Sequence, residues 1–494
     1  MKQLSKAMLT NEQAYPEKVL QFGTGNFLRA FSDWQIHEMN KKNLFNGSVV
    51  VVQSTPNGTV STINEQQGLY TLYLQGIKEN KPVSEHQVIS SISRGLNLVH
   101  QYDDYLALAK NPNLRFILSN TTEAGITFNS NDTLHDRPQK SFPGKLAAFL
   151  YERYQFFQGD PTKGFIILPC ELIEDNGNEL KRTIIKYADT WKLEVGFHEW
   201  IEEANTFCNT LVDRIVPGFP KDTIGEKTEE LGYTDKLIVS CEQFHLFVIE
   251  GPEFIKDEFP AEKAGLNVHV VDNLSSFRLK KVRILNGAHT VMTPVAYLSG
   301  LNTVREAVTT ANMKEFIEHV IYNEILPTLK FSKTELNQFA NDVLDRFRNP
   351  YIQHYLSSIS LNSIAKFKAR ILPTLLDYFD QYQKLPTGIV FSLSSLLYFY
   401  RGKRENEDIS LVDDDEILSF FKELWSNCDG SEVAIEILVS SALSEERIWG
   451  LNLTEVPNLK AMVTDYLIKI LHSGIKQAIP NKSQLKEDYN ESVY

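Results

Sequence analysis

The chain has 494 residues, of which 42% are hydrophobic, and it carries a formal net charge of −13. This length allows two domains with substantial cores, and the hydrophobic fraction is ordinary for a globular protein. The negative charge argues against a nucleic-acid partner, because the phosphates would be repelled. We therefore expect a globular protein that does not bind nucleic acid.

The four cysteines are widely scattered and form no CxxC pair, which argues against a disulfide framework and against a zinc knuckle. No HExxH motif occurs and the 11 histidines are dispersed, so we expect no metal site. Residues 1–18 lack the apolar core of a signal peptide, and no apolar run approaches the length of about 18 residues that a membrane span requires. We therefore expect a soluble, cytoplasmic protein without a membrane partner.

Near the start of the chain, residues 17–40 predict an apolar strand, a glycine turn and an amphipathic helix that begins near Asn26. Gly23 and Gly25 would let the backbone turn tightly and approach a pyrophosphate, whose charge is favourable at a helix N-terminus. Leu28 stands where the usual fingerprint has its third glycine, so a strand-to-helix turn without a ligand remains the alternative. The predicted cofactor-binding residues are Val19, Leu20, Gln21, Phe22, Gly23, Thr24, Gly25, Asn26, Phe27, Leu28, Arg29 and Ala30.

A second apolar strand, GSVVVVQ at residues 47–53, completes the pattern of a βαβ unit. It ends in Gln53, Ser54 and Thr55, with no acidic residue to hold the ribose hydroxyls. This position therefore does not decide between NAD and NADP.

Up to about residue 275, short β-rich runs such as LRFILSN, KGFIILPC and KLIVSCE alternate with helical stretches. Alternation of this kind indicates a mostly parallel sheet covered by helices. Beyond that point helical periodicity dominates, for example in the long segments from Thr303 and from Val456. The predicted fold class is α/β, with a Rossmann-like dinucleotide-binding domain at residues 1–275 and a mostly all-α domain at residues 276–494.

The segment KVRILNGAHT places Lys281, Asn286 and His289 within an arc of roughly 140° on an ideal α-helix. A lysine can transfer a proton, an asparagine amide can donate to a carbonyl or alkoxide oxygen, and a histidine can orient either one. Such a set is more often a solvated helix face. Here the flanking residues are largely apolar, which favours a buried helix whose polar groups need partners or a substrate. We predict a metal-free site for alcohol oxidation or ketone reduction.

These residues resemble a known family. GTGNFLRAFSDW and KVRILNGAHT are similar to segments of the polyol-specific long-chain dehydrogenase/reductase family, which contains mannitol dehydrogenases, fructuronate reductases and tagaturonate reductases. Five further family-like segments follow in order along almost the whole chain: QQGLYTL from Gln66, SNTTEAGI from Ser119, CNTLVDRIVPG from Cys208, GLNVHVVD from Gly265 and RFRNPYIQH from Arg346.

Within the family, the segments from Ile166 and from Glu242 most resemble the tagaturonate reductase branch. Leu172 stands where mannitol dehydrogenases and fructuronate reductases typically have an asparagine, and Asn176 is the nearest candidate to replace it at the substrate. The resemblance implies NAD as cofactor and reversible reduction of D-tagaturonate to D-altronate in hexuronate catabolism. The alternatives are a fructuronate- or mannitol-type dehydrogenase of the same family, and a nucleotide-binding protein that has lost turnover.

The resemblance also implies roles for individual residues. Lys281 would serve as general acid and base, Asn286 would stabilise the oxyanion, and His289 would position the substrate or the lysine. A sugar-acid substrate needs local cations in a chain of net charge −13, and we predict Lys366 and Arg370 for its carboxylate. Lys280, Arg283 and Lys368 are the other candidate cations. The oligomeric state is not predicted.

Overall fold

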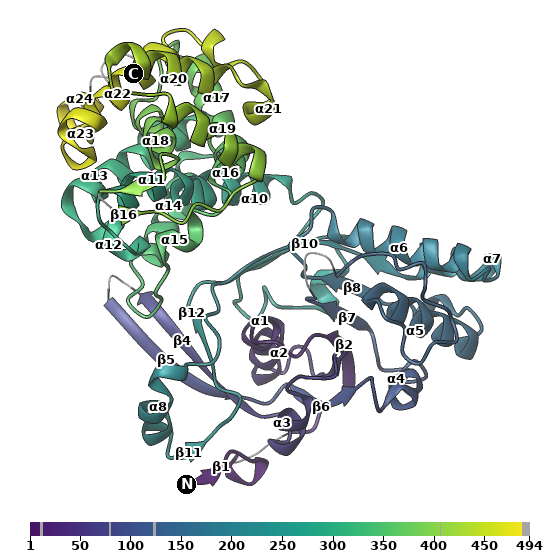
Figure 1. Ribbon diagram of the computed structural model, residues 1–494. Helices are drawn as coiled ribbons and strands as arrows, with labels where there is room; N and C mark the ends of the chain where they lie inside the picture. Colours follow the sequence, from purple (N-terminus) through teal and green to yellow (C-terminus); the bar gives the residue numbers. More distant parts are fainter. Residues whose placement is uncertain (10–12, 79–80, 122–124, 406, 487–494) are drawn as a thin grey trace. The chain divides into compact units, whose positions relative to one another are not determined.

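The computed structural model describes residues 1–9, 13–78, 81–121, 125–405 and 407–486 (Figure 1). Residues 122–124 of the family-like segment from Ser119 therefore lie outside the described residues. The chain divides into two compact units. The first comprises Met1–Gly76 and Val83–Phe277, and the second comprises Ile77–Pro82 and Arg278–Tyr494.

A six-stranded parallel sheet forms the centre of the first unit, as its alternating pattern predicts. The strand order is β6-β3-β2-β7-β8-β9, so the order reverses between β2 and β7. In parallel α/β sheets, ligands bind at the carboxyl ends of the strands on either side of such a reversal. The strands are β2 (Glu17–Phe22), β3 (Ser48–Gln53), β6 (Ile92–Asn97), β7 (Phe116–Ser119), β8 (Ile166–Pro169) and β9 (Thr206–Phe207).

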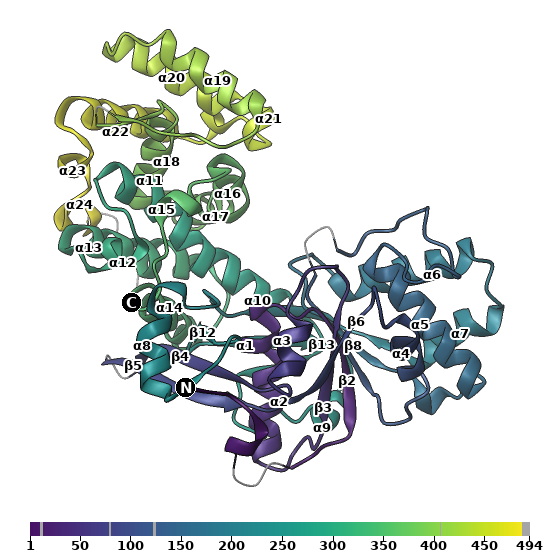
Figure 2. The ribbon, with the colours of Figure 1, turned by 60° about the horizontal axis from the view of Figure 1, so that its bottom comes forward.

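Both faces of this sheet are covered by helices, which explains why β3, β7 and β8 are buried along their whole length, without alternation. Along β3, Val49 and Val51 belong to one hydrophobic core, whereas Val50 and Val52 belong to the core on the opposite face. Figure 2 shows α1 to α3 on one side of the sheet and α4 to α7 on the other. These helices are α1 (Asn26–Ala30), α2 (Ser32–Lys41), α3 (Val60–Glu65), α4 (Tyr102–Leu108), α5 (Phe142–Phe157), α6 (Asn176–Thr190) and α7 (Val195–Ala204).

The run KLIVSCE forms a strand outside the main sheet. It becomes β12 (Val239–Glu242), which pairs in parallel with β4 (Tyr70–Lys78), and β4 also borders β5 (Lys81–Ile89). Local sequence cannot distinguish sheets, because pairing depends on remote partners. The other strands and α-helices described in this unit are β1 (Lys2–Gln3), β10 (Asn209–Asp213), α8 (Ile224–Leu231), β11 (Tyr233–Thr234), β13 (Leu246–Glu250), α9 (Ile255–Glu258) and β14 (Val268–Val271).

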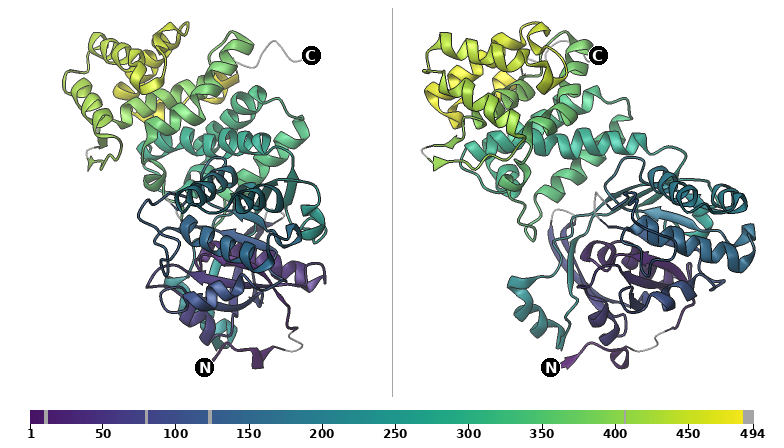
Figure 3. Two further views of the ribbon diagram at one scale, coloured as in Figure 1. Left: turned by 90° about the vertical axis from the view of Figure 1, so that its right-hand side faces the viewer. Right: turned by 45° about the vertical axis from the view of Figure 1, so that its right-hand side comes forward.

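The described residues of the second unit are mainly helical; their strands are the ends of β4 and β5 within Ile77–Pro82 and the two-residue strands β15 (Lys403–Arg404) and β16 (Glu407–Asp408) (Figure 3). The long helical segment expected from Thr303 is divided into α12, α13, a π-helix at Val320–Ile325 and a short 3₁₀ turn. The α-helices are α10 (Ser275–Lys280, which spans the boundary between the units), α11 (Gly287–Leu298), α12 (Val304–Thr309), α13 (Ala311–His319), α14 (Lys333–Phe347), α15 (Leu356–Ile359), α16 (Ser363–Arg370), α17 (Leu372–Tyr382), α18 (Thr387–Phe399), α19 (Asp415–Ser426), α20 (Glu432–Ser444), α21 (Glu446–Trp449), α22 (Leu459–Ser473), α23 (Ile475–Ala478) and α24 (Lys482–Lys486).

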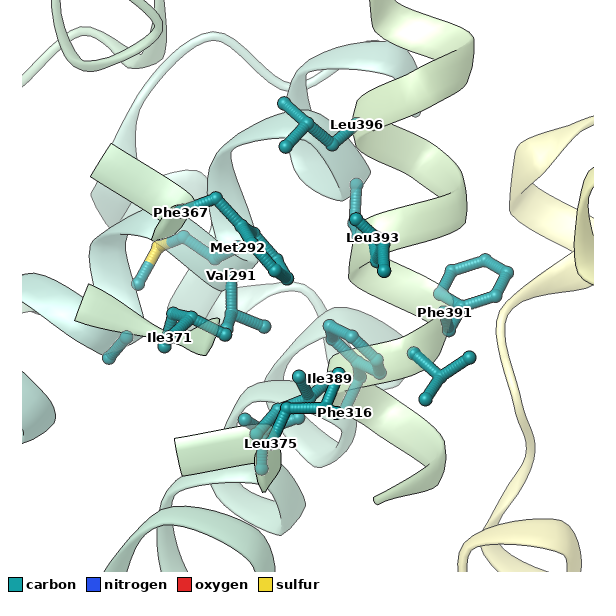
Figure 4. Close-up of a cluster of buried hydrophobic side chains, with 14 of the residues drawn as sticks. Val291, Met292, Phe316, Phe367, Ile371, Leu375, Ile389, Phe391, Leu393 and Leu396 are labelled. Atoms are coloured by element: carbon teal, nitrogen blue, oxygen red, sulfur yellow. The ribbon is translucent and has the colours of Figure 1, made fainter. Parts of the chain in front are cut away.

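Helix α11, which carries His289, lies in the core of the second unit. Figure 4 shows Val291 and Met292 of α11 among apolar side chains from α13, α16, α17 and α18. The Ser392 hydroxyl of α18 donates a hydrogen bond to the Val291 carbonyl, at 2.9 Å. The structure thus confirms the expectation that this helix is buried, and the polar groups along it are held by a closely packed scaffold.

Candidate functional site

The glycine turn follows β2 at the point where the strand order reverses. Gly23 has φ = +127°, in the region that favours glycine, and a Cβ atom added there would lie 3.1 Å from the Asn120 carbonyl oxygen. The Gly23 N–H donates to the Val52 carbonyl at the end of β3, at 3.2 Å. Gly23 is therefore the residue at which this turn requires a glycine.

Gly25 differs from what the sequence suggests. Its φ of −71° suits any residue, and a Cβ atom added there would meet nothing within 4 Å. The helix that follows is also shorter than expected, because α1 ends at Ala30 and Phe31 (φ −122°, ψ −88°) separates it from α2. The helix that begins at Asn26 has only five residues, so its dipole attracts a pyrophosphate less strongly than the dipole of the longer expected helix would.

A cavity of about 780 Å³ opens beside the turn, at the carboxyl ends of β2, β3 and β7. Its volume lies in the range of pockets that hold cofactors. Gly23 and Thr24 line it on one side, and Gln53, Ser54 and Thr55 line it at the end of β3. Among the residues that the structure describes, thirteen others line the cavity: Phe22, Val52, Asn120, Thr121, Gly125, Thr127, Phe128, Asn129, Ser130, Lys140, Ser141, Phe142 and Lys145.

In the second unit, Lys281–Asn286 form a π-helix directly before α11. The Gly287 N–H donates to the carbonyl of Val282, five residues earlier. Because a π-helix pairs residues i and i+5, Lys281 and Asn286 lie about one turn apart on the same side, nearer in angle than an α-helix would place them. Asn286 and His289 are three residues apart across the start of α11 and are neighbours on that surface. The π-helix thus favours the predicted arrangement, in which Lys281, Asn286 and His289 lie on one side of the helix.

His289 is buried, and its Nε2 has no hydrogen-bond partner among the described residues. Its ring packs on Phe347 and meets the His354 ring edge-on, with centroids 4.3 Å and 4.9 Å away. Burial, together with the positive charges of neighbouring groups, lowers the pKa of His289 well below its usual range. His289 is therefore a neutral imidazole at neutral pH, with a buried ring nitrogen that can still accept or donate one hydrogen bond.

The groups that depress the pKa of His289 are His354, Arg346, Arg370 and Lys366. The Arg370 guanidinium donates to Thr290 Oγ1 at 3.4 Å, and the Lys366 ammonium donates to the Ile359 carbonyl at 2.9 Å. Neither Lys366 nor Arg370 has an ion-pair partner within the part of the chain that the structure describes. The two predicted carboxylate-binding residues thus lie in an electropositive region around His289.

The alternative cations are engaged elsewhere. Lys280 pairs with Glu335, and Arg283 donates to Thr374 Oγ1 at 2.6 Å and pairs with Asp377 at 3.1 Å. Lys368 lines a separate cavity of about 670 Å³ that also contains Asp413, Asp414, Glu416 and Glu445. An anion would meet these acidic groups there, although Arg447 also lines the cavity. Since Asp413 also acts electrostatically on Lys366, the comparison favours Arg370 over Lys368 more than it favours Lys366.

Asn176 has both ends of its amide engaged inside the first unit. Its Nδ2 donates to the carbonyls of Pro169 at 3.0 Å and Glu171 at 3.1 Å, while its Oδ1 accepts from the N–H of Thr210 at 2.8 Å and of Gly177 at 2.9 Å. These contacts link the end of β8 to β10 and favour a structural role. A role for Asn176 at the substrate stays a prediction.

Arg346 and His354 were not singled out from the sequence, although both lie in the family-like segment RFRNPYIQH. Arg346 is buried near the end of α14, and His354 contacts the His289 ring. An arginine and a histidine eight residues apart around a proline carry no recognisable spacing, so chemistry alone gave no signal for them.

Within the described ranges, no group of three or more His, Cys, Asp or Glu side chains is arranged to hold a metal ion. In the same ranges, none of the helices combines the length and the apolar character that crossing a membrane requires.

The chain matches two family models. Residues 17–263 match the mannitol dehydrogenase Rossmann domain, and residues 273–471 match the mannitol dehydrogenase C-terminal domain. Altronate oxidoreductase from Bacillus subtilis (strain 168) is 55% identical over 97% of this chain and 98% of its own length. Altronate oxidoreductase from Yersinia enterocolitica is 44% identical over 94% of this chain and 97% of its own length.

Solved structures agree with this fold. A D-sorbitol dehydrogenase in substrate-free form superposes with a TM-score of 0.78 at 20% identity, covering 94% of this chain and 95% of that one. Pseudomonas fluorescens mannitol 2-dehydrogenase, in a ternary complex with NAD and D-mannitol, superposes with a TM-score of 0.67 at 21% identity, covering 96% of this chain and 95% of that one. With both domains matched in order over most of its length, the chain belongs to the mannitol dehydrogenase family, whose members are oxidoreductases acting on CH–OH groups.

Proposed function

We propose that this protein is an NAD-dependent oxidoreductase that reduces D-tagaturonate to D-altronate and also catalyses the reverse oxidation. The observation that carries the proposal is the electropositive region around neutral His289, three residues after Asn286 and eight after Lys281. A neutral polyol needs no such region, whereas a sugar acid does. The altronate oxidoreductases that resemble this chain over nearly their full length support the same substrate class.

The turn and its cavity fit a dinucleotide. Gly23 has the backbone conformation of such a turn, and the space beside Gly25 is open to a bulky ligand. When bound, the cofactor supplies the hydride. At the end of β3, the cavity is lined by Gln53, Ser54 and Thr55, which do not decide between NAD and NADP. We favour NAD because mannitol 2-dehydrogenase, which shares this fold, was solved in a complex with NAD. Residues 19–30 are the proposed cofactor-binding segment.

Lys281 and His289 are the two candidate proton donors, and the protonation state of His289 decides between them. Since burial and nearby cations keep His289 unprotonated at neutral pH, it is a poor general acid in the reducing direction. Lys281 therefore donates the proton to the carbonyl oxygen and removes it from the hydroxyl in reverse. The Asn286 amide donates to the developing oxyanion, and His289 holds a substrate hydroxyl through its buried Nε2.

Arg370 and Lys366 bind the substrate carboxylate in this proposal. A guanidinium can hold a carboxylate through two parallel hydrogen bonds, whereas an ammonium acts as a point charge. Arg370 is linked to the residue after His289 through Thr290 Oγ1, so it is the stronger candidate for orienting the substrate.

The test is substrate-dependent oxidation of NADH on tagaturonate, fructuronate and fructose, measured side by side and repeated with NADPH. We expect the highest kcat/KM on tagaturonate with NADH. A preference for fructuronate or fructose would assign the chain to another branch of the family. NADH binding without turnover on any of the three would instead indicate a binding protein.

A prediction about the glycine turn accompanies this proposal. Gly25→Val should fold normally, because its φ is ordinary and its Cβ meets no neighbour, yet it should weaken NADH binding about tenfold or more by filling space beside the turn. Gly25→Ala is the matched control and should have a smaller effect. Gly23→Ala should instead destabilise the fold, since a side chain there meets both a positive φ and the Asn120 carbonyl. Unchanged NADH affinity in folded Gly25→Val would place the cofactor elsewhere.

A further inference from the structure

The side chain of Gln21 joins the glycine turn to helix α2. Gln21 is buried in β2, and its Nε2 donates to the Gly23 carbonyl at 3.1 Å and to Asp33 Oδ2 at 3.2 Å. Its Oε1 accepts from the Ser32 hydroxyl at 3.2 Å. The Gly23 carbonyl can only accept a hydrogen bond, so the amide nitrogen must face it, and the orientation of the Gln21 amide is fixed.

The orientation of the Gly23 carbonyl also determines the direction of the Thr24 N–H. The carbonyl of Gly23 and the N–H of Thr24 share one peptide plane, and in a trans peptide they point in opposite directions. The hydrogen bond from Gln21 therefore holds the Thr24 N–H on the side away from Gln21. Thr24 lines the cavity beside the turn, and its carbonyl accepts from Thr59 Oγ1 at 3.2 Å. The direction of this N–H matters for any phosphate bound at the turn.

Asp33 is an unusual residue to find behind the turn. Its side chain is fully buried in α2, and its Oδ1 has no hydrogen-bond partner among the described residues. The nearby Arg29 guanidinium donates to the Leu237 carbonyl and to Asn26 Oδ1. A buried carboxyl with one oxygen unsatisfied costs stability, and an apolar residue of similar size would avoid that cost. Gln35 of the same helix also has an unsatisfied amide, so what distinguishes Asp33 is its hydrogen bond with the Gln21 amide behind the turn.

We propose that Asp33 is a positioning residue of the dinucleotide turn, and that it acts through the Gln21 amide on the Gly23 carbonyl to set the affinity for the cofactor's pyrophosphate. This inference rests on the proposed dinucleotide-dependent function. Asp33 itself does not touch the cofactor. Its Oδ2 holds one N–H of Gln21, which leaves the other N–H directed at Gly23.

The charge on Asp33 modulates this contact. Burial raises the pKa of Asp33 to about 7, so its carboxyl loses a proton across the neutral range. A carboxylate accepts a stronger hydrogen bond than a neutral carboxyl does. The hydrogen bond from Gln21 to Asp33 therefore becomes stronger as pH rises through about 7, and Gln21 then constrains the turn more strongly.

Other titratable groups around Asp33 come from several elements. Arg29 of α1 and Tyr70 of β4 interact with Asp33 electrostatically, and burial raises the pKa of Tyr70 well above its usual range, so its hydroxyl stays protonated. Beyond these two lie Asp235, which accepts hydrogen bonds from Gln66, Thr71 and Leu237, and Cys241, whose pKa burial raises to about 11. Tyr70 and Cys241 thus keep one charge state across the range in which Asp33 titrates.

The experiment measures NADH dissociation constants by fluorescence titration of the full chain between about pH 6 and about pH 8.5, a range that brackets the Asp33 pKa of about 7. In the parent, affinity should rise with pH. Asp33→Asn should match the parent at the acid end and lose the rise, ending about threefold to tenfold weaker at the alkaline end. The KM for NADH should follow the dissociation constant while kcat stays near that of the parent.

Gln21→Leu should weaken NADH binding about tenfold or more at every pH, and adding Asp33→Asn to it should change nothing further. Gln35→Leu is the matched control. Gln35, which lies in α2, is likewise a buried glutamine, but neither end of its amide has a partner among the described residues. Its replacement should leave NADH affinity and the pH profile unchanged.

A parent-like pH profile in Asp33→Asn, or parent-like affinity in folded Gln21→Leu, would overturn the inference while leaving the proposed function intact. If Gln21→Leu does not fold, the isosteric Asp33→Asn decides alone. A parent protein that binds neither NADH nor NADPH would overturn the proposed function and this inference with it.

Discussion

Lys281→Ala is expected to lower turnover by about 10²–10⁴-fold, which is the contribution that general acid–base groups typically make. The lysine is the first residue of the π-helix at Lys281–Asn286, and neutral His289 leaves it as the proton donor of the proposed mechanism. NADH affinity should stay near that of the parent, because the glycine turn belongs to the other unit. The measurements are the maximal rate on tagaturonate and the NADH dissociation constant.

Lys281→Arg separates charge from proton transfer. Arginine keeps the positive charge, yet it stays protonated at any physiological pH and so cannot cycle a proton. We expect it to be nearly as inactive as the alanine variant, with a similar melting temperature to the parent. Parent-like turnover in Lys281→Arg would show that Lys281 acts through its charge, and parent-like turnover in both variants would remove it from the mechanism.

The first βαβ unit is predictable because each of its signals is local. Four consecutive valines in β3 indicate a strand buried on both faces, and glycines after β2 mark a turn before a helix. The difference between Gly23 and Gly25 is not predictable in this way. Which glycine adopts a positive φ depends on the close approach of the carbonyl of Asn120, the residue that follows β7 and lies far from the turn in sequence.

In the second unit, too, some features of the site are predictable from local sequence and others are not. The sequence places Lys281, Asn286 and His289 on one buried helix, because apolar residues flank them at helical spacing. The π-helix that brings Lys281 and Asn286 nearer in angle has no local signature, since it depends on how α10, α11 and their neighbours pack. Similarly, the proximity of Arg346 and His354 to His289 follows from the fold of α14 and the loop after it.

Local patterns also leave buried polar side chains ambiguous. Asn176 resembled a substrate residue by its place in the chain, but its amide partners Pro169 and Thr210 come from β8 and β10. The link between Gln21 and Asp33 is hidden for the same reason, because residues twelve apart on a strand and a helix share no periodicity. Positions of this kind become interpretable only when each donor and acceptor is accounted for.

Arg370→Ala is expected to lower kcat/KM on tagaturonate, because it removes about 2–5 kcal/mol of transition-state binding free energy, the usual cost of truncating one partner of a desolvated charge pair. This corresponds to about 30-fold to 5,000-fold. Turnover of a neutral ketose such as fructose should change little, because it has no carboxylate to lose a partner. The measurement is therefore the ratio of kcat/KM on tagaturonate to that on fructose, before and after the substitution.

Three further variants assign the carboxylate contact. Lys366→Ala should lower the same ratio, but less than Arg370→Ala, since an ammonium offers a point charge where a guanidinium offers two aligned donors. Arg370→Lys should recover part of the loss. Lys368→Ala is the matched control, because Lys368 lies on the same helix but lines a separate cavity with four acidic residues. If the ratio falls in Lys368→Ala but not in Lys366→Ala or Arg370→Ala, the carboxylate is bound in the cavity that Lys368 lines. If the ratio is unchanged in all of them, the electropositive region around His289 does not select the acid, and Arg346 becomes the next residue to test.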